Sequence, residues 1–338
     1  MKEKKEYWQR IRGICILAVV LIHSLGGFNY STGYGTEFVV LRQIINFAVA
    51  TFVFMAGYFV NVDALSDKEF SYKHWIIYRW GRLCIPFMIW SLLYSGLELL
   101  KIVHSGNEIH WFEFVYRFIV GKSATPFYYI VVLVQLTVIT PWLVKTVKQN
   151  GVISRILWLV TPLYLMYLYA WNYIVGISPR LYETLFPAWF VFYYLGIHVR
   201  CGWKLKCNGY AAAGALALSC VEAVGLRAVG FDIGFYTSQI TVGSFLYSVT
   251  IIGWLLKKNE NNRGGCHLLS KIGDCSYGIF YIHMAVLMIV GRFIKCGNWY
   301  VYWILRFALT AAISYIIVHI AQIVLKNHKK LLRYIGFV

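Results

Sequence analysis

The chain has 338 residues, of which 59% are apolar and only 14% are charged, whereas soluble domains carry about 25% charged residues. Together with a mean hydropathy of +0.61, this composition excludes an ordinary soluble domain. A formal net charge of +18 would suggest nucleic-acid binding in a soluble protein, but its distribution along the chain indicates another origin.

Ten apolar stretches are long enough, or nearly so, to cross a hydrocarbon core of about 30 Å. They cover residues 11–28, 38–60, 80–100, 126–144, 155–171, 183–199, 209–225, 236–256, 276–294 and 299–325. The stretches are apolar on all sides, which excludes the alternating pattern of a β-barrel. The parts between them are too short for a core of their own. The sequence therefore predicts an all-α polytopic membrane helix bundle of about ten transmembrane helices, in a single domain over residues 1–338.

The basic residues predict how the chain is oriented in the membrane. If the N-terminus is cytoplasmic, the predicted inner segments and the helix ends facing them hold 23 of the 32 lysines and arginines. This asymmetry is the positive-inside pattern of plasma-membrane proteins, and it places both termini in the cytoplasm. The net charge is thus explained by topology, and no nucleic-acid partner is predicted.

Cysteine and metal chemistry receive no support from the sequence. Of the eight cysteines, only Cys296 falls in a predicted outer connection, so no extracytoplasmic disulfide framework is expected. There is no Cys-x-x-Cys pair and no histidine and cysteine cluster with zinc-ligand spacing. We expect no metal cofactor.

The first apolar stretch carries Arg12 and His23, eleven residues apart. At about 100° and 1.5 Å per residue, both side chains lie on one helix face, about 16 Å apart along the axis. We expect the arginine at the membrane surface and the histidine within the bilayer. An ionisable group inside a membrane is costly, so His23 is a functional hypothesis. The alternative is a structural histidine that donates to a backbone carbonyl.

Arg79 and Arg82 begin the third apolar stretch and, being three residues apart, lie on one helix face. Like Arg12, they are predicted at the cytoplasmic end. Three guanidinium groups that converge there could bind a phosphorylated ligand through bidentate contacts. The alternative is ordinary anchoring of the helix by positive charges at the inner surface.

The ninth apolar stretch opens with Ser276 and Tyr277 and carries His283, which shares a helix face with Ser276 about 10 Å away. Two buried histidines in one bundle could move a proton to or from a reacting hydroxyl. The alternative for His283 is hydrogen bonding between helices. Two carboxylates within the predicted spans, Glu98 and Glu222, belong to no motif, although Glu98 could orient a histidine.

Taken in order, these motifs resemble the membrane acyltransferase-3 family, which includes sugar O-acetyltransferases of bacterial envelopes. The resemblance rests on Arg12-x10-His23, Phe52-Val53-Phe54-Met55-Ala56-Gly57-Tyr58-Phe59, Arg79-x-x-Arg82-x-x-x-Pro86 and Ser276-Tyr277-Gly278-x-x-Tyr281-x-His283. Two positions depart from the family pattern. Gln9 stands where the family often has an acidic residue, and Ala56 stands where it usually has serine.

The resemblance implies an enzyme that moves an acyl group, commonly acetyl, from cytoplasmic acetyl-CoA or another acyl-CoA. The acceptor would be a hydroxyl of an extracytoplasmic or lipid-linked glycan. We expect His23 to act as general base with Arg12 and His283 in the catalytic site. The residues expected to bind the CoA donor are Arg12, Arg79, Arg82, Ser276 and Tyr277. Aromatic residues on the outer side that could stack on a sugar are Tyr30, Tyr34, Tyr128 and Trp171, although interfacial belts explain them as well.

The alternative function is transport of an amino acid or a modified glycan. Related membrane domains are fused to serine racemases, and a fragment of such a fusion would resemble this chain. Here a basic tail, Lys326 to Val338, follows the last apolar stretch. The expected partners are the lipid bilayer, the acyl donor and the acceptor, and the pattern is compatible with a homo-oligomer.

Overall fold

The computed structural model describes residues 2–25, 35–67, 69–260, 266–294 and 296–337. Within these ranges the regular secondary structure is helical throughout, which confirms the predicted all-α class. The α-helices are α1 (Lys2–Ser24), α2 (Thr36–Ile45), α3 (Phe47–Tyr58), α4 (Tyr72–His104), α5 (Trp111–Ile119), α6 (Tyr128–Gln149), α7 (Val152–Ile156), α8 (Val160–Val175), α9 (Phe190–Arg200), α10 (Gly209–Ala228), α11 (Ile233–Tyr236), α12 (Val242–Glu260), α13 (His267–Asp274), α14 (Ser276–Phe293), α15 (Trp299–Val324) and α16 (Lys329–Tyr334). Short 3-10 helices are η2 (Ala64–Ser66), η3 (Thr125–Phe127), η4 (Leu157–Leu159) and η5 (Phe186–Ala188).

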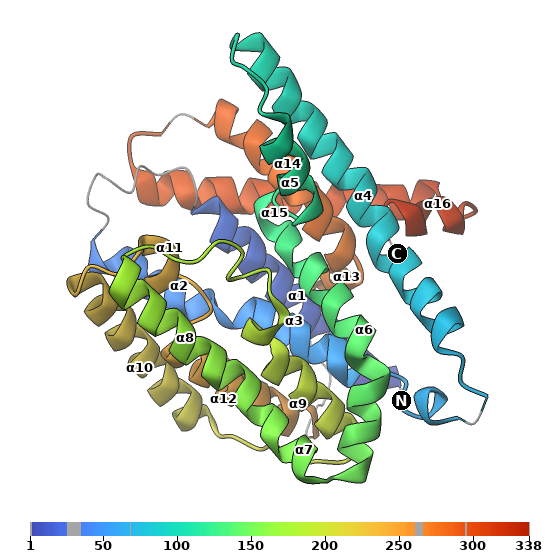
Figure 1. The fold of residues 1–338 in the computed structure, drawn as a ribbon. Coiled ribbons are helices and arrows are strands. Elements are labelled where there is room, and N and C mark those ends of the chain that lie inside the picture. The colour runs from blue at the N-terminus through green and yellow to red at the C-terminus, as the bar shows by residue number, and fades with distance from the viewer. Residues whose placement is uncertain (1, 26–34, 68, 261–265, 295, 338) are drawn as a thin grey trace.

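Helices α1 and α3 occupy the middle of the bundle. In Figure 1, α8, α9, α10 and α12 lie on one side of this pair, and α4, α14 and α15 lie on the other. The contacts agree, because α3 packs on α9 and α12 while α1 packs on α14 and α15. Any cavity between the two groups is therefore lined by α1 and α3.

The number of helices able to cross a membrane differs from the sequence prediction. In the described ranges, seven helical stretches are long and apolar enough by themselves, against the ten predicted. The other three predicted stretches correspond to α1, α9 and α12. Helix α9 has only 11 residues, because the first part of the predicted stretch 183–199 forms turns and η5. Helix α1 is polar near both ends, and α12 ends in Lys257 and Lys258.

The predicted stretch 38–60 is interrupted at Asn46, which separates α2 from α3. The buried Asn46 amide donates to Gln43 Oε1 at 3.1 Å and to the Ser238 carbonyl at 2.9 Å. Nearby, Arg42 donates from Nε to the Thr237 carbonyl and from Nη1 to the Ile22 carbonyl, both at 3.2 Å. These bonds satisfy buried polar groups and join the ends of α1 and α2 to the segment before α12.

Helix α4 extends along the edge of the bundle and is held there partly by the C-terminal segment (Figure 1). Trp90 on α4 donates to the Ile335 carbonyl at 2.9 Å, and its ring stacks on Phe337 with centroids 6.1 Å apart. Gln322 on α15 donates to the Phe337 carbonyl at 2.8 Å. The tail therefore connects α4, which carries Arg79 and Arg82, to α15.

The predicted orientation can be tested by labelling single cysteines in a variant whose native cysteines are replaced. We expect cysteines at Thr32, Gly106 and Asn298 to react with a membrane-impermeant maleimide from outside intact cells, because the positive-inside pattern places these connections there. Thr32 lies outside the described residues. A cysteine at Lys204, in a predicted inner connection, serves as control and should react only after permeabilisation. Protection of two of the three outer positions would overturn the orientation.

Candidate active site

A cavity of about 460 Å³ lies inside the bundle, between the central helices and α4, α6 and α14. Six of the seven predicted site residues line it: Arg12, His23, Arg79, Arg82, Ser276 and Tyr277. The seventh, His283, lies directly behind His23 and is fully buried. Predicted residues that are up to 265 positions apart in the sequence, Arg12 and Tyr277, therefore meet around one space.

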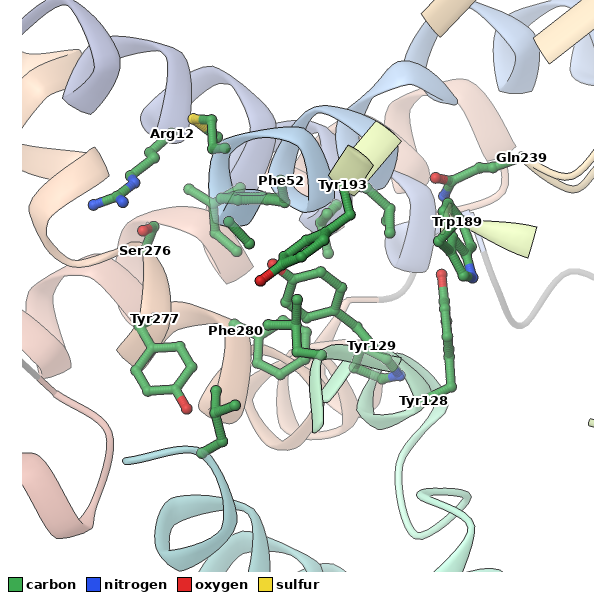
Figure 2. Close-up of a pocket in the computed structure, with 18 of the residues that line it drawn as sticks. Arg12, Phe52, Tyr128, Tyr129, Trp189, Tyr193, Gln239, Ser276, Tyr277 and Phe280 are labelled. Carbon is green, nitrogen blue, oxygen red and sulfur yellow. The ribbon is translucent and has the colours of Figure 1, made fainter. Parts of the chain in front are cut away.

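The cavity has two chemically different ends, and aromatic rings lie between them. Figure 2 shows Arg12, Ser276 and Tyr277 at one end and Tyr128, Trp189 and Gln239 at the other. The rings between the two ends belong to Phe52, Tyr129, Tyr193 and Phe280. A ligand that spans both ends would thus pass along these aromatic rings.

The first end is cationic, because Arg12, Arg79 and Arg82 all line it. Each guanidinium lies over an aromatic ring: that of Arg12 is 5.2 Å from the Phe59 centroid, and that of Arg79 is 5.8 Å from the Trp75 centroid. The ion pairs between described residues join Arg10 to Glu6 and Arg117 to Glu98, and neither involves Arg12, Arg79 or Arg82. The charges of Arg12, Arg79 and Arg82 are thus available at this end of the cavity, which favours an anionic ligand.

Helix α14 is joined to the cationic end by Tyr277. Its hydroxyl donates to the Arg82 carbonyl at 3.3 Å and lies 3.0 Å from the Tyr281 hydroxyl. Ser276 begins α14 and also lines the cavity, at the same end as Arg12 in Figure 2. Ser276 and Tyr277 therefore lie at the cationic end of the cavity, together with the arginines with which the sequence grouped them.

The two histidines form a close pair with ring centroids 5.3 Å apart. His283 Nδ1 lies 2.8 Å from the Phe280 carbonyl and 3.0 Å from the Ile279 carbonyl. A carbonyl can only accept, so Nδ1 carries the hydrogen and Nε2 is a bare acceptor. That Nε2 is buried without a partner among the described residues. His283 thus bonds within its own helix, which differs from the interhelical bond considered above, and leaves an acceptor beside His23.

His23 lies in the last turn of α1, whereas Arg12 lies near the middle of that helix. The predicted separation along one helix face holds, since both side chains line the same cavity. Helix α1 runs from Lys2 to Ser24, so His23 lies eleven residues beyond Arg12, next to the C-terminal end of the helix. The base candidate is thus at the far end of the cavity from Arg12, Arg79 and Arg82.

The second end contains two charged residues that sequence reasoning missed, Arg42 and Glu183. Arg42 is held by carbonyls of α1 and of the segment before α12, as described above. Glu183 accepts from the Tyr182 hydroxyl at 3.1 Å, and its carbonyl accepts from Trp189 Nε1 at 2.8 Å. Burial raises the pKa of the Glu183 carboxyl, while the Tyr182 hydrogen bond and the positive charges of Arg42 and Lys122 act against that rise. Arg42 could have been noticed in the sequence, because it is a charged residue inside the predicted apolar stretch 38–60.

The segment Phe52 to Phe59 both lines the cavity and packs against α9. Phe52, Met55, Ala56 and Phe59 line the cavity. A Cβ at Gly57 would lie 2.1 Å from the Tyr193 carbonyl oxygen, so only glycine lets α9 approach α3 this closely. This approach brings Tyr193 and Trp189 to the cavity wall.

Of the other residues considered above, Glu98, Glu222 and Trp171 do not line the cavity. Glu98 pairs with Arg117 of α5, and Glu222 accepts from the Tyr169 hydroxyl and the Gly243 amide. Tyr128 lines the cavity and Trp171 does not, while Tyr30 and Tyr34 lie outside the described residues. Within the described ranges, no group of three or more His, Cys, Asp or Glu side chains could hold a metal ion.

Comparison with known proteins supplies one independent finding. A family model described as an acyltransferase domain matches residues 5–319. The matched range includes every cavity residue named above. No curated protein and no solved structure gives a significant match.

Proposed function

Because the chain belongs to the acyltransferase-3 family, we propose that it transfers an acyl group from cytoplasmic acyl-CoA to an acceptor hydroxyl outside the membrane core. The acyl group is acetyl, and the acceptor is a hydroxyl of an extracytoplasmic or lipid-linked glycan. The protein acts in the plasma membrane as a multi-pass enzyme.

One observation carries this proposal: a single cavity is lined at one end by the guanidinium groups of Arg12, Arg79 and Arg82, which form no ion pair among the described residues, and at the other by His23, whose ring lies 5.3 Å from that of the buried His283. CoA carries phosphates at one end of a long arm and the acyl thioester at the other. Arg12, Arg79 and Arg82 bind the phosphates, and Ser276 and Tyr277 complete that part of the site. The arm follows the aromatic wall, so that the thioester comes near His23.

The chemistry is a direct transfer in which His23 acts as general base. His23 takes the proton of the acceptor hydroxyl while the oxygen attacks the thioester carbonyl, and the new C–O bond forms. The C–S bond then breaks, and His23 returns the proton to the departing sulfur. His283 supports this step, because its bare Nε2 can accept a hydrogen bond from the ring of His23 and so fix the tautomer.

The second end of the cavity suits a sugar. The rings of Tyr128 and Trp189 are stacked with centroids 6.0 Å apart, and such planes pack against the faces of sugar rings. Arg42, Glu183 and Gln239 line the same end and can bind hydroxyl groups. The acceptor hydroxyl would then be presented to His23.

The proposal is tested with the purified protein in lipid nanodiscs. We expect release of free CoA from acetyl-CoA when envelope glycan from a strain lacking the gene is added, and mass spectrometry should find acetyl groups on that glycan. In cells, deletion of the gene should remove the same modification. If no CoA is released and the glycan is unchanged in both assays, the proposal is wrong. Uptake of an amino acid or a glycan by proteoliposomes without CoA release would favour transport instead.

A further inference from the structure

Helix α13 lies against α1 at an unusually short distance, and two glycines allow it. A Cβ at Gly273 would lie 1.8 Å from the Gln9 carbonyl oxygen, and one at Gly13 would lie 2.2 Å from the Leu269 carbonyl oxygen. Neither position can hold a side chain without separating the helices. The contact therefore sets the position of the residue after Gly273, which is Asp274, relative to α1.

Asp274 is connected to Arg12 through one intervening side chain. Gln9 donates from Nε2 to Asp274 Oδ1 at 2.6 Å, and its Oε1 accepts from Arg12 Nη1 at 3.2 Å. The Arg12 guanidinium also lies over the Phe59 ring. The amide of Gln9 thus has a fixed orientation, with its NH₂ group toward the carboxylate and its oxygen toward the guanidinium.

The location of Asp274 is unfavourable for the helix that carries it. Asp274 is the last residue of α13, where the helix dipole favours cations over carboxylates. Its side chain is exposed, so packing against other residues does not explain an aspartate at this position either. The carboxylate accepts the hydrogen bond from Gln9, and its charge also favours the positive charge of the nearby Arg12.

We propose that Asp274 is a positioning residue that orients Arg12, through Gln9, toward the phosphates of the acyl donor. This inference rests on the proposed function. A carboxylate bonded directly to Arg12 would hold it but would also compete with a phosphate for its charge. The neutral amide holds the guanidinium in place and leaves its charge for the donor. Asp274 therefore sets donor affinity without contacting the donor.

The test is a double-mutant cycle with D274A and Q9L, measured as KM and kcat for acetyl-CoA. Losing one ordinary hydrogen bond corresponds to about two- to tenfold in affinity, so we expect D274A to raise KM by that factor with little change in kcat. Q9L should raise KM at least as much. In the Q9L background, D274A should have no further effect, because the bridge through which it acts is gone. With acetyl-pantetheine, which lacks the phosphates, none of the variants should change KM.

D63A is the matched control, since Asp63 is an exposed carboxylate between α3 and α4 and does not line the cavity. It should leave both constants unchanged. Independent, multiplicative effects of D274A and Q9L would show that Asp274 does not act through Gln9, and an unchanged KM in D274A would also overturn the inference. Absence of acyl transfer in the unmodified protein would instead contradict the proposed function. The two failures are therefore distinguishable.

Discussion

Replacing His23 by glutamine is expected to lower kcat for acyl transfer by about 10²- to 10⁴-fold, the usual contribution of a general base. Glutamine is similar in size and polarity, but its amide takes up no proton at neutral pH. Donor binding should change little, because His23 lies at the opposite end of the cavity from Arg12, Arg79 and Arg82. The loss should therefore appear in kcat, with an almost unchanged Kd for acetyl-CoA measured by calorimetry.

His319→Gln provides the control. His319 is half-buried on α15 and stacks on Tyr315 with centroids 5.4 Å apart, and it does not line the cavity. This variant should retain full activity. An H23Q variant within a few-fold of the unmodified protein would contradict the general-base role. An H23Q variant that fails to elute as a folded monodisperse species would support the structural role of His23 instead.

Residues that share one helix could be placed together from the sequence. The helical period alone puts Arg12 and His23 on one face, and the structure places both on one cavity wall. The same reasoning placed Arg79 and Arg82 on one helix face. Such predictions succeed because spacing within a helix is set by backbone geometry, which does not depend on the neighbouring elements.

Relations between helices could not be predicted in the same way. The 5.3 Å approach of His283 to His23 depends on how α14 packs against α1, and no spacing encodes that. Glu183 was missed because it precedes α9 in an irregular segment that the apolar pattern assigned to a span. The contact between Gly13 and Gly273, which brings Asp274 to Gln9, involves two isolated glycines far apart in the chain. The histidine pair, the position of Glu183 and the glycine contact all depend on tertiary packing.

Arg79 and Arg82 are expected to tolerate lysine poorly if they bind phosphate. Lysine keeps the positive charge but loses the planar fork that grips a phosphate through two parallel hydrogen bonds. Losing one charge-assisted bond costs about 1.5–3 kcal/mol, which corresponds to about 10- to 150-fold in affinity. We therefore expect R79K and R82K each to raise KM for acetyl-CoA by such a factor, with a much smaller change in kcat.

The phosphates can be removed from the donor to complete this experiment. With acetyl-pantetheine the effect of R79K and R82K should shrink toward none, because the groups that the arginines bind are absent. R333K is the matched control: the Arg333 guanidinium lies 4.9 Å from the centroid of the Tyr78 ring, the ring that Arg82 also covers, but Arg333 does not line the cavity. It should leave KM unchanged with both donors. Equal losses with acetyl-CoA and acetyl-pantetheine would show that Arg79 and Arg82 anchor α4 at the inner surface, since anchoring does not depend on which donor is present.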